Sequence, residues 1–148
     1  MNNAKSKTKP ARFTVGYSGT PLPAKLGLKS GQRVLAVNPP AHLPDLLSGA
    51  PVDLNWLHRA TAFDVALVFV TDRATLSREF RRLAPKLPDA GMIWIAWPKK
   101  TSGVVTELTE DIVRETGLAA ELVDVKVCAI DATWSGLKFV RRLRDRVT

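Results

Sequence analysis

Two uninterrupted apolar runs, residues 63–71 (FDVALVFVT) and 91–98 (GMIWIAWP), constrain the fold more than any other feature of the sequence. Strands that are apolar on both faces are typical of the centre of a parallel sheet that is covered by helices on both sides. Between the two runs, apolar side chains recur at helical spacing, at Leu76, Phe80, Leu83 and Leu87. This periodicity predicts a helix over residues 73–87 and, with the flanking strands, an α/β fold.

Shorter segments extend this pattern toward the N-terminus. Residues 33–38 and 52–57 are apolar enough to form two further strands, and residues 41–47 are expected to form a short helix between them. After the second long run, Thr106 or Thr109 is expected to cap a helix, and Gly117 is expected to close it.

The last third of the chain changes character. Residues 122–130 alternate apolar and polar side chains, and residues 137–143 return as a partner strand. This pattern predicts an antiparallel C-terminal hairpin on a mostly parallel, three-layer, Rossmann-like sheet. We expect one α/β domain over residues 12–148, preceded by a flexible basic tail at residues 1–11.

Composition supports a globular domain. The chain has 148 residues, 45% hydrophobic and 24% charged. No apolar run approaches the roughly 20 residues that a membrane-spanning helix needs, and the N-terminus lacks the apolar core of a secretory signal. Cys128 is the single cysteine, so no internal disulfide can form, and we expect a reducing, cytoplasmic location.

The net charge of +8 raises the question of nucleic-acid binding. Residues 1–12 hold four basic residues and no acid (+4), and residues 138–148 hold five basic residues and one acid (+4). The remaining 13 basic and 13 acidic residues cancel in between. Charge confined to the two ends favours solvated tails over a nucleic-acid-binding face; tail-driven, non-specific nucleic-acid binding is kept as an alternative.

The stretch from Leu26 to Val37 (LGLKSGQRVLAV) resembles the lead-in to the first strand of class I methyltransferases. The order of predicted elements from residue 26 to 143 is also similar to that fold. In that family a glycine-rich turn follows the strand and an acid at the end of the second strand holds the cofactor ribose. Here the turn is Asn38-Pro39-Pro40, and Asp53 lies at the wrong end of its strand.

The resemblance therefore implies the fold and not the cofactor. Residues 58–62 are also too few for a crossover helix, so the methyltransferase-like core is expected to be truncated. We predict no cofactor and a non-catalytic ligand- or partner-binding domain. We further expect the space above Asn38, Thr71 and Lys99 to be shallow and partly filled.

Over nearly its whole length the chain also resembles a small bacterial family of domains of unknown function. The resemblance is carried by the segments GYSGTPL (16–22), KLG (25–27), IAWPKK (95–100), LTED (108–111), VDVK (123–126) and WSGLK (134–138). It implies a bacterial protein with this fold and brings no activity with it.

The loop after the second long run is the best candidate site, because open α/β sheets bind ligands at the carboxyl ends of their strands. Its lysines, hydroxyls and glycine, ahead of a predicted helix, are suited to an anion. The candidate anion-binding set is Asn38, Thr71, Asp72, Lys99, Lys100, Ser102 and Gly103. A solvated basic connection is the competing interpretation. An enzyme acting on an anionic small molecule, with Asp72 as base and Lys99 holding the anion, is the alternative from another class.

Other motifs were weighed and set aside. Residues 16–20 (GYSGT) resemble a hydrolase nucleophile elbow, but the last position is threonine and prolines follow where a helix should start. His42, His58 and Cys128 do not have the spacing of a zinc site. Trp134 lies in the predicted hairpin turn, and the sequence leaves open whether it is exposed or covers the end of the sheet.

Overall fold

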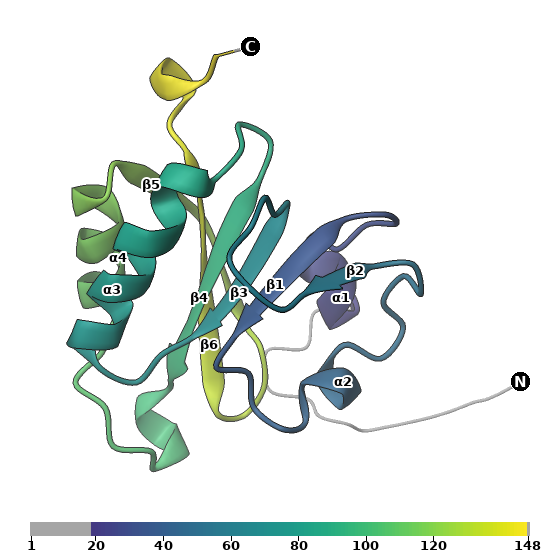
Figure 1. Ribbon diagram of the computed structural model, residues 1–148. Coiled ribbons are helices and arrows are strands. Elements are labelled where there is room, and N and C mark those ends of the chain that lie inside the picture. The colour runs from purple at the N-terminus through teal and green to yellow at the C-terminus, as the bar shows by residue number, and fades with distance from the viewer. Residues whose placement is uncertain (1–18, 148) are drawn as a thin grey trace, which may run out of the picture.

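The computed structural model describes residues 19–147, which form a three-layer α/β domain (Figure 1). Its six strands lie in the order β2-β1-β3-β4-β6-β5. Strands β1 to β4 are parallel, and β6 pairs antiparallel with both β4 and β5. The strands span Arg33–Val37 (β1), Asn55–Leu57 (β2), Val65–Phe69 (β3), Met92–Pro98 (β4), Leu122–Ala129 (β5) and Trp134–Arg141 (β6). The predicted fold class is confirmed.

The two faces of the sheet are covered unequally. The longer helices α3 (Arg73–Leu83) and α4 (Glu110–Ala119) pack on one face. The other face carries only the four-residue helices α1 (Leu22–Lys25) and α2 (Leu43–Leu46) and their loops. Short 3-10 turns occur at Ala84–Lys86 (η1), Lys100–Ser102 (η2) and Leu143–Asp145 (η3).

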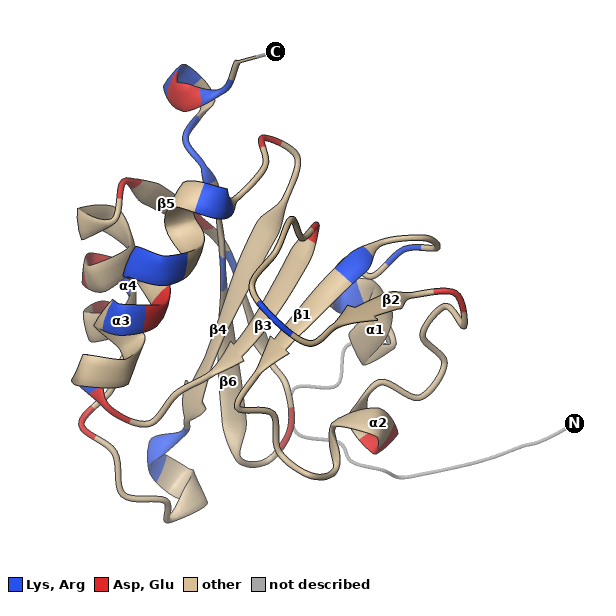
Figure 2. Cartoon of the chain, viewed as in Figure 1, with Lys and Arg blue, Asp and Glu red and all other residues tan. Residues whose placement is uncertain are grey.

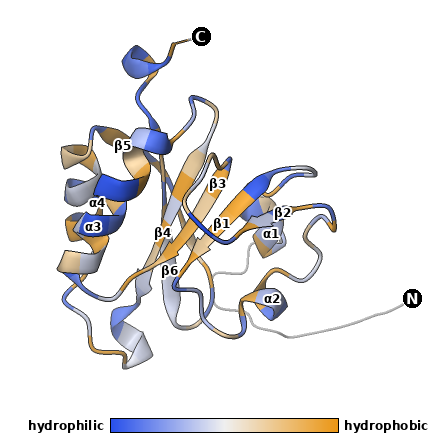
Figure 3. Cartoon of the chain, viewed as in Figure 1, coloured by the Kyte–Doolittle hydropathy of each residue, from blue (hydrophilic) through white to orange (hydrophobic). Residues whose placement is uncertain are grey.

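The central strands are apolar because both of their faces are covered. Every residue of β3 is buried, as is all of β4 after Met92 (Figure 3). On the α3 and α4 side, Leu76, Phe80 and Leu83 pack with side chains of β4 and β6. On the other side, Trp94 packs with residues of α1 and α2, and its indole N–H donates to the carbonyl of Leu26 at 2.9 Å.

No helix lies between β2 and β3, as the short linker predicts. Residues 58–64 instead cross β1 directly on the α3 side (Figure 1), where Phe63 and Ala60 join the core of that layer. Asp64 closes the crossing, because its carboxylate accepts the backbone N–H of Arg33 at 2.7 Å and pairs with the Arg33 guanidinium at 3.0 Å.

Strands β1, β2 and β3 and helix α2 are shorter than predicted, and three further boundaries differ from the predictions for local reasons. Helix α3 ends at Leu83 and tightens into η1, because Pro85 has no N–H to continue the helix. Gly117 lies inside α4 and does not close it, since the helix continues to Ala119. Strand β6 begins at Trp134, three residues before the predicted start, because it already pairs there with Pro98.

The predicted tail at residues 1–11 and the GYS of the elbow-like segment lie outside the described residues. Within residues 19–147, no helix is long and apolar enough to cross a membrane.

Candidate functional site

The carboxyl edge of the parallel strands is where the candidate residues gather, as the parallel arrangement predicts. Asn38 follows β1, Thr71 and Asp72 follow β3, and Lys99 follows β4. These strands are neighbours, so the loops that follow them share one edge of the sheet (Figure 1). Within the candidate set, the side chains of Asp72 and Ser102 and the backbone carbonyl of Thr71 form hydrogen bonds inside the fold.

Asp72 is the N-cap of α3. Its carboxylate accepts the backbone N–H of Thr75 at 2.8 Å and the Thr75 hydroxyl at 3.1 Å. The backbone hydrogen bond from Thr75, then its hydroxyl, hold the pKa of Asp72 below its ordinary value. A carboxylate that is held ionised by a helix cap is a poor proton acceptor, which weakens its assignment as a general base.

Thr71 is tied to the segment that precedes α4. Its carbonyl accepts the hydroxyl of Thr106 at 2.6 Å, and that hydroxyl in turn accepts the N–H of Leu108 at 3.1 Å. Leu108 is buried in the core of the α3 and α4 layer. This bond fixes the long connection across the end of β3.

The loop from Lys99 to Gly103 is closed on itself. The Ser102 hydroxyl donates to the Lys99 carbonyl at 2.7 Å and accepts the N–H of Val104 at 3.1 Å. As expected, the loop lies ahead of a helix, but residues 104–109 separate Gly103 from Glu110, where α4 starts, and Thr109 caps the helix. The first turn of α4 carries Glu110 and Asp111, whose charges repel an anion. Anion binding by this loop stays a prediction, with less support from the geometry.

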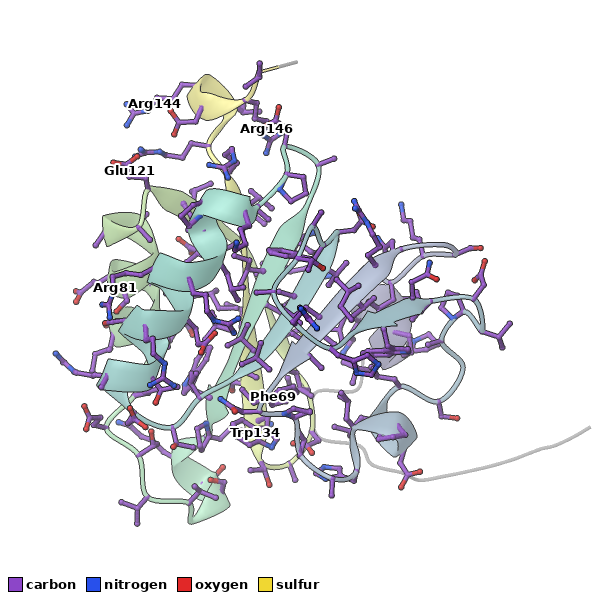
Figure 4. All side chains as sticks on the ribbon, in the orientation of Figure 1. Phe69, Arg81, Glu121, Trp134, Arg144 and Arg146 are labelled. Carbon is purple, nitrogen blue, oxygen red and sulfur yellow. The ribbon has the colours of Figure 1, made fainter. Side chains whose placement is uncertain are left out.

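Trp134 closes the middle of the carboxyl edge. Its ring meets the ring of Phe69 edge to face, with centroids 5.1 Å apart (Figure 4). Asp131 fixes the turn before it, because the carboxylate accepts the N–H groups of Thr133 at 2.8 Å and Trp134 at 2.7 Å. The tryptophan that the sequence left unplaced therefore folds over the end of the sheet.

Beside this closed centre, the carboxyl ends of β1 and β2 open into a pocket of about 680 Å³. Its lining residues come from the ends of the two strands and from the intervening loops and α2: Ala36, Pro39, Pro40, Ala41, Leu43, Pro44, Leu47, Ala50, Pro51, Leu54, Trp56, Leu57 and His58. Asn38, Thr71 and Lys99 do not line this pocket, so the expectation of a shallow, partly filled space above them stays a prediction. The short helix α2 does not reach across to β2, so the gap between them stays open.

The side chains of the pocket lining are apolar except for the imidazole of His58 and the indole N–H of Trp56. Trp56 contributes the one aromatic ring of the lining and is 43% exposed. His58 is the one titratable side chain among the described residues of the lining. Four of the lining residues, Pro39, Pro40, Pro44 and Pro51, have no backbone N–H to offer a ligand. A wall of this kind selects ligands by shape and apolar surface.

A hydrogen bond holds α2 over the pocket. His42, the N-cap residue of α2, contacts the Asp131 carboxylate through Nε2 at 2.9 Å. Burial of Asp131 raises its pKa, but the hydrogen bonds from His42 and from the backbone N–H groups of Trp134 and Thr133 outweigh it, and the pKa lies below its ordinary value. The contact joins the start of α2, at the edge of the pocket, to the turn between β5 and β6.

Sequence reasoning missed Trp56, His58 and the residues of α2 as a site. The signal was present as a proline-rich stretch, residues 39–51, between two short strands. Prolines stiffen a loop and interrupt helices, so such a stretch cannot fold down as a long covering helix. The carboxyl ends of β1 and β2 are therefore poorly covered.

The methyltransferase-like sheet implies S-adenosylmethionine, and the residues at the expected position do not fit it. The turn after β1 has Asn38 in a left-handed conformation (φ 53°) and then two prolines, so the N–H groups of a glycine turn are missing. The lining at the end of β2 has Leu57 and His58 and no carboxylate. Asp53 precedes β2 and accepts a hydrogen bond from Ser30.

His42 contacts one carboxylate, that of Asp131 at 2.9 Å, and a single such pair does not make a metal site. Among residues 19–147, no group of three or more His, Cys, Asp or Glu side chains is placed to hold a metal ion.

Comparison with solved structures places the fold among methyltransferases. Fibrillarin from Aeropyrum pernix, determined with S-adenosyl-L-methionine, matches with a TM-score of 0.51 and 16% identity over 80% of this chain and 73% of its own. Precorrin-6y C5,15-methyltransferase from Geobacter metallireducens matches with a TM-score of 0.57 and 8% identity over 82% of this chain and 86% of its own.

An O-methyltransferase family 2 protein from Planctomyces limnophilus, in complex with apigenin, matches with a TM-score of 0.57 and 14% identity over 76% of this chain and half of its own (50%). No family model matches the sequence. No curated protein matches it. At these identities the likeness establishes a methyltransferase-like fold, while membership of the small bacterial family stays a prediction.

Proposed function

We propose that this chain is a non-catalytic ligand-binding domain built on a methyltransferase-like sheet. Its binding site is the pocket at the carboxyl ends of β1 and β2, and its ligand is a largely apolar molecule that carries a ring. The observation that supports this most is the lining of the roughly 680 Å³ pocket, in which prolines, leucines and Trp56 replace the polar groups that a nucleoside needs.

The size of the pocket suits a small molecule. Ligand sites in proteins usually fall between about 300 and 1,000 Å³ and combine apolar walls with a few polar groups. Trp56 can stack on a planar ring, and His58 is the single side chain of the lining that can both donate and accept a hydrogen bond. A ligand with one polar substituent on an apolar ring system could stack on Trp56 and form a hydrogen bond with His58.

Several features argue against catalysis at this edge. Asp72 is engaged as a helix cap, and Ser102 bonds to its own loop. The apolar pocket offers neither a carboxylate nor a nucleophile beside His58. An enzyme acting on an anionic molecule, the alternative from the sequence, therefore has less support than binding alone.

A fluorescence titration with 1-anilinonaphthalene-8-sulfonate, an apolar ring compound with one polar group, tests the pocket. We expect saturable binding with one site per folded chain. Trp56→Ala removes the aromatic wall and Ala41→Trp fills the space, so each should weaken binding about tenfold or more, the equivalent of about 1.4 kcal/mol.

Leu143→Ala is the matched control, because Leu143 is 79% exposed and lies in η3, away from the pocket. It should bind the dye as the unaltered protein does, and all three variants should melt at temperatures close to its own. Equal dye binding by Trp56→Ala, Ala41→Trp and the control would show that the dye reports another surface and would remove support for this site.

A further inference from the structure

Basic residues gather on one part of the folded surface, although basic and acidic residues cancel over residues 13–137. On the α3 and α4 side, arginines pair with carboxylates: Arg82 with Glu79 at 2.5 Å, and Arg114 with Asp124 at 2.9 Å. In Figure 2, α3 carries both basic and acidic residues and α4 carries acidic ones, whereas α1 and the loop after it carry basic residues. Neutrality of the sequence between the tails therefore does not mean a neutral surface.

Two lysines face each other across the C-terminal hairpin. Lys126 on β5 is the register partner of Lys138 on β6. Residues directly opposite in an antiparallel pair have neighbouring side chains on the same face, and like charges there are destabilising. The Lys126 ammonium reaches toward α1, where it donates to the carbonyl of Lys25 at 3.1 Å.

Lys29, in the loop after α1, adds a third charge to this face. Burial lowers the pKa of Lys138, and the positive charges of Lys126 and Lys29 lower it further. Among residues 19–147, no carboxylate forms an ion pair with Lys29, Lys126 or Lys138, and residues 1–18 contain no Asp or Glu. We call these three residues the lysine patch.

The surface next to the patch is hollowed. A depression of about 420 Å³ is lined by Lys25 and Lys126 together with Thr20, Ala24, Val127, Cys128 and Ala129. The lining connects α1 with β5, so the lysine patch borders a concave part of the surface.

We propose that the lysine patch binds the phosphate backbone of a nucleic acid. An anion between Lys126 and Lys138 would relieve their repulsion. Lysine ammonium groups act as point charges without the planar fork that reads bases, and the hollow has no aromatic residue in its lining. The binding is therefore independent of sequence and strongly dependent on salt. This site lies at the β6–β5 end of the sheet, away from the apolar pocket at β2.

Fluorescence anisotropy with a short labelled duplex and the full-length protein tests this directly. Each lost phosphate contact reduces the slope of log affinity against log salt by about 0.9. Lys126→Gln combined with Lys138→Gln should therefore weaken binding at low salt roughly tenfold and reduce the slope by about 1.8. Because it removes a repulsive pair, this variant should melt at or above the temperature of the unaltered protein.

Arg81→Gln combined with Lys86→Gln is the matched control. It removes the same charge from exposed positions of α3 and η1 on the opposite face, and it should leave affinity within about twofold. Equal weakening by both double variants, or no binding of the duplex by the intact protein at low salt, would overturn the proposal. Binding to phosphatidylserine vesicles without binding to the duplex would assign the patch to membranes and overturn it as well.

Discussion

Asn38 keeps the backbone shape of a glycine turn without the glycine. It ends β1 with φ at 53°, a region in which asparagine is the best tolerated residue after glycine. Asn38→Gly should leave the free energy of unfolding within about 0.5 kcal/mol of its present value, whereas Asn38→Val should reduce it by about 1–2 kcal/mol. Urea denaturation measures both, and a valine variant as stable as the unaltered chain would contradict the assigned conformation.

Gly117 is required by packing inside α4. A Cβ at this position would lie 2.1 Å from a ring carbon of Phe139. Alanine normally stabilises a helix by about 1 kcal/mol relative to glycine, but here overpacking should dominate, so Gly117→Ala should destabilise the domain by about 1–3 kcal/mol. Adding Phe139→Leu, which makes room for the methyl group, should recover part of the loss in urea denaturation. A Gly117→Ala variant more stable than the unaltered protein would disprove this contact.

The error over Gly117 shows where sequence reasoning stops. Glycine near a helix end is commonly a cap, and only the partner strand β6, which carries Phe139, reveals the other reason for it. The cap at Thr109, by contrast, is local, and its side chain accepts the N–H of Ile112 as the sequence predicts. Local backbone chemistry could be predicted, while contacts between distant segments could not.

At the scale of elements, the turn that contains Asp131 joins the hairpin to α2. One oxygen accepts two backbone N–H groups and the other contacts His42. Asp131→Ala should cost about 1–2 kcal/mol at neutral pH, because two partly buried N–H donors lose their acceptor. Asp131→Asn keeps an acceptor oxygen and should cost less in the same thermal or chemical denaturation measurement.

The pH dependence of this contribution has a definite sign. The pKa of Asp131 lies below its ordinary value in the folded chain, so its carboxylate stabilises the fold above about pH 4 and loses that effect as the pH falls through the folded pKa. The stability difference between the unaltered protein and Asp131→Asn should therefore shrink under acidic conditions. A difference that grows below pH 4 would contradict the hydrogen-bond arrangement.

The elements themselves were largely predictable because their signals are local. Runs that are apolar on both faces became the buried strands β3 and β4, and helical periodicity placed α3. The pocket was not predictable, since it depends on how far α2 stands from β2. Composition indicated an excess of basic residues at the two ends of the chain, Lys138 among them, but only the pairing of β5 with β6 brings Lys126 opposite Lys138.

At the scale of the whole molecule, the helical layers on the two faces of the sheet should lose different amounts of stability when a buried leucine is replaced by alanine. Leu83 is fully buried under α3, whereas Leu47 lines the pocket. Leu83→Ala should cost about 2–5 kcal/mol, the range for well-packed cores, and Leu47→Ala should cost less because its surroundings are already open on one side. Equal losses in urea denaturation would mean that the α2 layer is packed as tightly as the α3 layer.

The central claim is that the pocket of this methyltransferase-like sheet is an apolar site that no longer fits S-adenosylmethionine. Isothermal titration calorimetry of the full-length protein with S-adenosylmethionine tests it most directly. The absence of glycine-turn donors at Pro39 and Pro40, and of a carboxylate beside His58, predicts no detectable binding up to millimolar concentration. Binding with a micromolar dissociation constant would contradict the account and return the chain to the cofactor-dependent methyltransferases.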